Sequence, residues 1–262
     1  MSLALSHGHV EGRPISEAER ALRVDLAAAY RLVALRGWDD LIYTHLTARV
    51  PKVPNVPGEP DCFLINPFGL RFDEVTASNL VKIDTQGRVV GASVHPVNAI
   101  GFRIHATVHA ARADAHCVMH LHHVHGAAVS AQAAGLLPIS QHAMRFYGQV
   151  GYHDYEGLTL TETEGVKLVA SLGAYPALLL RNHGTLVCGR TVAEAFVLMD
   201  TLDRACDIQL KAQAGGTPLV TPPPAVLEHT LRQLTDDDVP EGGREWPALL
   251  RLLDKIDPSY RE

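Results

Sequence analysis

The chain has 262 residues, a formal net charge of −6 at pH 7, and a composition of 47% apolar and 20% charged residues. A chain of this length can bury a sizeable core without disulfides or structural metals. Because it has no basic block, the composition argues against nucleic acid or an anionic membrane as a partner.

The four cysteines are far apart and form no CxxC pair. This spacing favours reduced core thiols in a cytoplasmic protein over a disulfide framework or a zinc knuckle. The first residues, MSLALSHGHVEGRP, lack the features of a signal peptide, and no run approaches 18 apolar residues. We therefore expect neither a leader nor a transmembrane helix. The cysteines are Cys62, Cys117, Cys188 and Cys206.

The first half of the chain mixes helical and strand patterns. Residues 1–17 are expected to form a flexible arm, and Ser16 and Glu19 form a capping box that opens a helix ending at Gly37. The loop at 51–60 contains four prolines. The patterns predict strands at 41–50 and 61–65, a short helix at 75–81, a hairpin over 81–90 and a helix at 97–113.

The second half alternates short apolar runs with helical patterns. Strands are predicted at 117–120, 176–182 and 185–188, and helices from Gly126 to Gly135 and over 191–212. Residues 216–262 are expected to be a proline-rich linker and a short helical tail that packs on the core or on a neighbour. This alternation predicts an α/β fold, a three-layer α/β/α sandwich around a mixed sheet. Since GxGxxG and P-loop motifs are absent, the nucleotide-binding versions of that architecture lack support.

The stretch MHLHHVHG, residues 119–126, holds four of the 15 histidines. Residues two apart on a strand point to the same side, so His120 and His122 can bind one metal ion through their ring nitrogens. The alternative is that they are polar residues at the mouth of a strand. His183, directly after the apolar run LLLRN, is the candidate third ligand that a catalytic metal site requires.

The remaining histidines give weaker patterns. His105 and His109 lie one helical turn apart, and hydrogen-bonded or partly exposed positions are the preferred interpretation for both. His123 should point away from the HxH pair, His125 should begin a helix, and His116 should be exposed.

The chain resembles the class II aldolase/adducin family. The matching pieces cover residues 18–215 in order, and several favour the adducin branch: NPFGL, EVTASNLVKID, GLLPIS, YHDYEG and RNHG. The resemblance implies a largely antiparallel central sheet and a homotetramer with sites between neighbouring subunits. It also implies a divalent metal, usually zinc with manganese or cobalt as alternatives, held by His120, His122 and His183.

The chain departs from the family at the positions that carry its acid/base chemistry. The family's glutamate or aspartate falls on Gly101, and serines that bind a substrate phosphate fall near Ala99 and Ile100. A tyrosine that a neighbouring subunit supplies as proton donor falls near His142, with Tyr147 close by. His142 is therefore the candidate catalytic acid/base, because imidazole titrates near neutral pH; a surface or interface role is the alternative.

The candidate substrate contacts are His45, Asn66 and Gly69, and His45 stands where the family has an asparagine. Arg181 is expected to be an ion-paired residue under the strand end.

Two functions remain open from the sequence. The first is a metal-dependent, aldolase-like lyase, or a related epimerase or decarboxylase, acting on a small hydroxy- or oxo-carbonyl compound. A non-phosphorylated or carboxylate substrate is preferred because the phosphate-binding serines are missing. The second is a non-catalytic oligomeric module like the head domain of adducins, which Gly101 favours and the intact ligand set disfavours.

Overall fold

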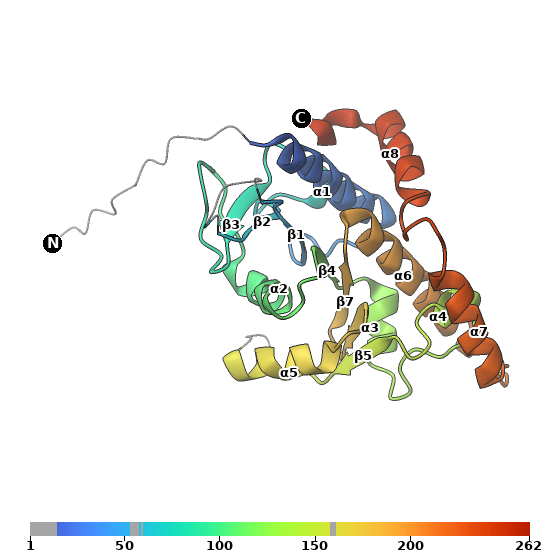
Figure 1. The fold of residues 1–262 in the computed structure, drawn as a ribbon. Helices are drawn as coiled ribbons and strands as arrows, with labels where there is room; N and C mark the ends of the chain where they lie inside the picture. The colour runs from blue at the N-terminus through green and yellow to red at the C-terminus, as the bar shows by residue number, and fades with distance from the viewer. Residues whose placement is uncertain (1–14, 53–57, 59, 158–160) are drawn as a thin grey trace.

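One seven-stranded sheet forms the centre of the protein (Figure 1). The computed structural model describes residues 15–52, 58, 60–157 and 161–262. The strand order is β3-β2-β1-β4-β7-β6-β5, and every neighbouring pair is antiparallel except β5 with β6. The strands are β1 (His45–Arg49), β2 (Cys62–Ile65), β3 (Val81–Asp84), β4 (Cys117–Leu121), β5 (Val150–His153), β6 (Ala177–Leu180) and β7 (Gly184–Gly189). The predicted mixed, largely antiparallel sheet is confirmed.

Helices cover both faces of this sheet, which confirms the three-layer sandwich (Figure 1). On one face α1, α3, α6 and α8 pack over the main core, and on the other α2 and α5 cover two smaller apolar clusters. The helices are α1 (Glu17–Arg36), α2 (Ala99–Ala111), α3 (Val124–Ser130), α4 (Gln141–Met144), α5 (Glu162–Leu172), α6 (Val192–Ala214), α7 (Pro224–Thr235) and α8 (Glu245–Ile256), with 3-10 turns η1 (Phe72–Glu74) and η2 (Pro258–Arg261).

The α1 helix forms where the sequence predicts it, but only half of the predicted capping box is present, because the Glu19 carboxylate pairs with Arg23 and Lys82. The Ser16 hydroxyl accepts a hydrogen bond from the Glu19 amide, and Gly37 ends the helix in the left-handed conformation with φ of 67°. Its buried face carries Tyr30, whose hydroxyl accepts hydrogen bonds from the amides of Leu46 and Asn66. This hydroxyl therefore joins α1 to the start of β1 and the end of β2.

The predicted helix at 75–81 is wrong. The Asn79 side-chain oxygen accepts from the Thr76 amide, and the Thr76 hydroxyl accepts from the Asn79 amide. These local side-chain bonds satisfy the backbone in a turn and so compete with helix formation. The predicted strand at 41–50 shortens to β1, because Leu41 and Thr44 have positive φ angles of 55° and 66°.

Four helices and strands of the structure had no counterpart in the sequence prediction, one of which is the short helix α4. β5 is a short edge strand, α5 begins at the Thr161–Glu164 capping box, and α7 begins with Pro224 at its first position. The expected arm falls mostly on residues 1–14, and the loop at 51–60 partly on residues 53–57 and 59, outside the described residues.

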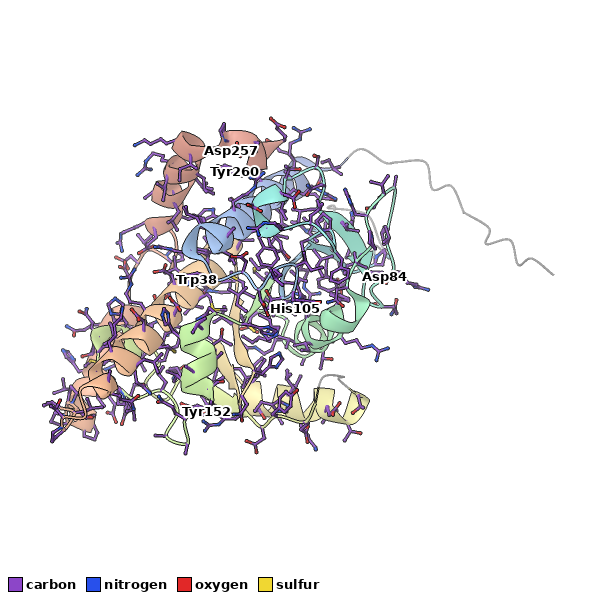
Figure 2. All side chains as sticks on the ribbon, turned by 180° about the vertical axis from the view of Figure 1, so that it is seen from behind. Trp38, Asp84, His105, Tyr152, Asp257 and Tyr260 are labelled. Carbon is purple, nitrogen blue, oxygen red and sulfur yellow. The ribbon has the colours of Figure 1, made fainter. Side chains whose placement is uncertain are left out.

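The C-terminal segment packs against α1. The Trp246 indole donates to the Asp25 carboxylate, and the Tyr260 carbonyl accepts from the Ala77 amide. Tyr260 is fully buried and lies with Asp257 at the α1 end of the molecule (Figure 2). The tail thereby fixes the turn that precedes β3.

No helix within the described ranges has the length and apolar character needed to span a membrane.

Candidate metal centre

Three histidines meet where β4 ends and β7 begins. His120 is in β4, His122 follows its last residue, and His183 lies in the turn between β6 and β7. One ring nitrogen of each lies within 4.8 Å of those of the other two. The structure thus brings together the three residues that the sequence singles out as metal ligands.

The turn that delivers His183 has an unusual backbone. Asn182 adopts φ of 58°, a left-handed conformation that asparagine tolerates better than most residues. A Cβ atom at Gly184 would lie 2.4 Å from the Leu121 carbonyl oxygen, so only glycine allows β7 this close to β4. The RNHG motif therefore encodes both the turn and the close approach.

Hydrogen bonds set the tautomers of His120 and His122. The His120 Nδ1–H donates to the Thr185 carbonyl at 3.0 Å, and the His122 Nδ1–H donates to the Asp40 carboxylate at 3.0 Å. The two Nε2 atoms, 3.2 Å apart, consequently carry the lone pairs and face each other. Metal-binding histidines are typically oriented in this way by a carbonyl or carboxylate behind the ring.

Burial keeps the rings of His120 and His183 neutral. It lowers the pKa of His120 well below the usual 6.5, and neighbouring His183 and His122 lower it further. Burial also lowers the pKa of His183 to about 4, with His122 adding to the effect. Neutral imidazoles can bind a divalent cation near pH 7 without first losing protons.

His123 and Asp203 lie behind Thr185 and support it. The His123 Nε2 lies 2.9 Å from the Thr185 hydroxyl, and the His123 Nδ1 lies 2.7 Å from the Asp203 carboxylate. His123 is the N-cap of α3 and points away from the triad, as predicted, and His125 lies in the first turn of that helix. Both are thus structural neighbours of the site.

His45 lies on the other side of His120. It pairs with His120 in the β1–β4 register, and the two ring centroids are 6.1 Å apart. Both ring nitrogens of His45 are buried without a hydrogen-bond partner among the described residues. A Cβ atom at Gly101 would lie only 2.7 Å from the His45 ring, so this imidazole fills the space that a side chain at 101 would need.

A hydrogen-bonded column lies behind His45. The Ala115 carbonyl must accept from the His109 Nδ1–H at 2.8 Å, so the His109 Nε2 accepts from the Thr47 hydroxyl at 2.8 Å. The Thr47 oxygen can then accept from the His105 Nδ1–H at 2.6 Å, and the His105 ring stacks on His45. His105 and His109 are buried and hydrogen-bonded, rather than partly exposed, and His105 lies in the interior (Figure 2).

This column makes stability depend on pH. Burial lowers the pKa of His45 to about 4 and of His109 to about 3, and it lowers that of His105 well below 6.5. An unfolded histidine binds a proton near pH 6.5, so between pH 6.5 and 4 the unfolded state binds more protons than the folded state. We expect the free energy of unfolding of metal-free protein to decrease as the pH is lowered from 6.5 to 4. The decrease should be about 1.4 kcal/mol per pH unit for each such histidine.

Urea unfolding at pH 7, 6 and 5 measures this slope. Replacing exposed His116 by glutamine should leave the slope unchanged, whereas His109→Gln should reduce it. A free energy of unfolding that is constant over this range would contradict the buried, neutral state of the column.

The close fit between Gly101 and His45 gives a second prediction. Gly101→Ala places a methyl group against the packed His45 ring and should destabilise the protein by about 1–3 kcal/mol. In a His45→Ala background the same change should instead stabilise, since alanine is the better helix residue. A double-mutant cycle by urea unfolding tests this. If Gly101→Ala changed the free energy of unfolding equally in wild type and in His45→Ala, the result would contradict the prediction.

The other predicted site residues occupy different places. Asn66 is buried at the end of β2 beside the start of β1, and Gly69 is exposed in the following turn with φ of 104°. His142 lies in α4 and lines a separate hollow with Arg145, Glu194 and Glu241, while the triad residues lie elsewhere in the described chain. Within one chain, His142 and the triad are therefore apart.

Two features differ from what the sequence indicates. Arg181 donates to the carbonyls of Ser130 and Gln132 and stacks on Tyr152, whereas an ion pair was expected. Asp40, 82 residues from His122, was missed because no local pattern links a surface aspartate to a distant histidine. His116 is exposed, as predicted.

Comparisons with known proteins find a matching family model and similar solved structures. The family model described as "Class II Aldolase and Adducin N-terminal domain" matches residues 24–210. A crystal structure of an aldolase II superfamily protein from Pseudomonas syringae is 47% identical, with a TM-score of 0.89, covering 95% of this chain and 98% of that one.

Two further proteins extend the comparison in different directions. Alpha-adducin of Rattus norvegicus is 42% identical over 260 residues, covering 94% of this chain but 34% of adducin. The L-fuculose 1-phosphate aldolase from Glaciozyma antarctica is 26% identical, with a TM-score of 0.79, covering 96% of this chain and 97% of that one. The fold, the match over most of the chain and the identity to these relatives lead to one conclusion: the chain belongs to the class II aldolase and adducin family.

Proposed function

We propose that the protein is a metal-dependent, aldolase-like lyase that acts on a small hydroxy- or oxo-carbonyl compound. The observation that carries this proposal is the triad of His120, His122 and His183, with two tautomers fixed so that Nε2 faces the centre. Three histidine ligands leave a coordination position for substrate, as catalytic sites require. Zinc is the best fit to three imidazoles, with manganese or cobalt as alternatives.

The bound metal would supply Lewis acidity, polarising a carbonyl and stabilising an enediolate. The chain's own groups would position the substrate around it. His45 is suited to hydrogen-bond a substrate oxygen, because its ring nitrogens lack partners beside His120. Asn66 and Gly69, at the same edge of the sheet, are the further proposed contacts.

Proton transfer would need a group from outside the chain's own triad. We assign it to His142 of a neighbouring subunit in a cytoplasmic homotetramer, since His142 is remote from the triad within one chain. Burial lowers the pKa of His142 and Arg204 adds to this, which favours the neutral, proton-accepting form near pH 7.

The second candidate is an oligomeric module without catalysis. It is favoured by glycine at position 101 and by the likeness to alpha-adducin. The fixed tautomers and the Asp40 carboxylate behind His122 weigh against it, because a module that binds no metal has no need of them.

One experiment separates the two functions. Zinc-loaded protein is incubated in D2O with a panel of short hydroxyaldehydes, hydroxyketones and keto acids, and NMR follows deuterium entry next to the carbonyl and carbon–carbon cleavage. The proposal expects exchange or cleavage that chelator removes, that zinc restores, and that a His183→Ala variant lacks. Failure of every compound to react with the zinc-loaded protein would favour the module.

A further inference from the structure

A small hollow lies directly beside the triad, on the side of His183 away from β4. Its volume is about 60 Å³. Its apolar floor consists of Ile104, Leu168 and Leu180, of which the two leucines are buried. Tyr155 stands at its rim, with its ring edge-on to His183 at 6.2 Å. The residues around its polar wall are His153, Asp154, Tyr155, Glu156, Gly157, Glu164 and Arg181.

The position and size of this hollow limit what it can hold. Because His183 belongs to the triad and also lines the hollow, a molecule bound to a metal at the triad would lie next to it. Since a protein cavity of roughly 150 Å³ holds benzene, a hollow of less than half that volume accommodates only a group of a few non-hydrogen atoms. A methyl or hydroxymethyl chain end is of this size, and the apolar floor suits its carbon.

The charges around the hollow oppose an anion. Glu156 is paired with Lys167, which also acts on the Glu164 carboxylate and helps to lower its pKa, while Asp154 has no ion-pair partner among the described residues. A backbone hydrogen bond from Thr161 holds the pKa of Glu164 below its usual value, so this carboxylate is ionised at neutral pH. The three carboxylates outnumber the cations Lys167 and Arg181, so an excess of negative charge faces any group that enters.

The two basic residues of the wall do not balance these charges. The Arg181 guanidinium donates to the carbonyls of Ser130, Gln132 and Ala133 and lies 4.4 Å from the Tyr152 ring. Its N–H groups are thus occupied within the chain rather than open for a fork-like bond to an anion, although the guanidinium keeps its positive charge. Burial lowers the pKa of His153, so this ring is neutral near pH 7.

We infer that this hollow is the subsite for the chain end of the substrate, and that it takes a short uncharged end, methyl or hydroxymethyl, and rejects carboxylate or phosphate. The inference rests on the proposed function, since it assumes a metal-bound substrate. It also narrows the substrate class suggested by the sequence, which favoured a non-phosphorylated or carboxylate substrate.

Binding of simple zinc chelators tests the subsite without any catalytic assay. Calorimetry on zinc-loaded protein compares glycolohydroxamate, which ends in hydroxymethyl, with malonic monohydroxamate and phosphonoacetohydroxamate, which add an anion at the chain end. We expect the neutral probe to bind at least about fivefold more tightly at low salt, with a smaller difference at high salt.

The Asp154→Asn/Glu164→Gln double variant should shrink this preference, and glutamine at 164 retains the capping box. The control variant Glu228→Gln, which removes an exposed carboxylate from α7, should leave the preference unchanged. Equal or tighter binding of the anionic probes would overturn the subsite while leaving the proposed function intact. If the zinc-loaded protein binds none of the three, the proposed function fails and the subsite fails with it.

Discussion

Replacing Gly184 by alanine is expected to weaken metal binding and to destabilise the fold. The new methyl group would lie 2.4 Å from the Leu121 carbonyl oxygen and 3.2 Å from the His122 ring. Because the first contact is with backbone, the strands must move apart, which costs about 1–3 kcal/mol. The movement also separates His183 from His122, so metal affinity should fall by more than about tenfold.

Two measurements are needed to interpret that variant, urea unfolding and zinc affinity by competition with a chromogenic chelator. Gly215→Ala is the matched control, because a Cβ there meets nothing nearer than 4.0 Å. His183→Ala is the second control, which should lose zinc while keeping near-normal stability. A Gly184→Ala protein with unchanged stability and zinc affinity would show that the close approach of β4 and β7 is not required.

The sequence predicts the sandwich well because its main elements carry local patterns. The Ser16 N-cap of α1, the apolar runs of β4 and β6 and the glycine that ends α1 each encode their own structure. The elements that were missed or wrong depend on context. β5 is an edge strand of four residues, and the 75–81 segment has helix-like composition but is held in a turn by Thr76 and Asn79.

The candidate site divides in the same way. The spacing of His120 and His122 alone predicts that they point to the same side of a strand. The position of His183 at a strand end adds the third ligand, because strand ends of one sheet meet at one edge. The groups behind the ligands could not be predicted, since Asp40 and Thr185 come from distant parts of the chain. The complementary fit of His45 and Gly101 likewise appears only once β1 and α2 are packed together.

Replacing Asp40 by alanine should weaken zinc binding by about 10–100-fold while the protein stays folded. The carboxylate accepts the Nδ1–H of His122, which orients the ring and raises the basicity of its Nε2. Since the Asp40 side chain is about half exposed, with a relative exposure of 47%, its loss leaves no buried group unpaired on its own side.

Competition with a chelator of known affinity measures this effect, with circular dichroism to confirm folding. Asp40→Asn should give an intermediate loss, because the amide oxygen can still accept the hydrogen bond but carries no charge. Asp39→Asn is the matched control, since Asp39 faces Arg71 rather than His122. Equal zinc affinity in Asp40→Ala and wild type would mean that His122 needs no support from this carboxylate.

The metal content of the protein tests the central claim most directly. Elemental analysis of tag-free protein purified without chelators should find about one zinc, manganese or cobalt ion per chain, and close to none in the His120→Ala variant. Wild-type protein that binds no divalent metal, even after incubation with each ion and removal of the excess, would contradict the three-histidine metal site and the lyase function built on it.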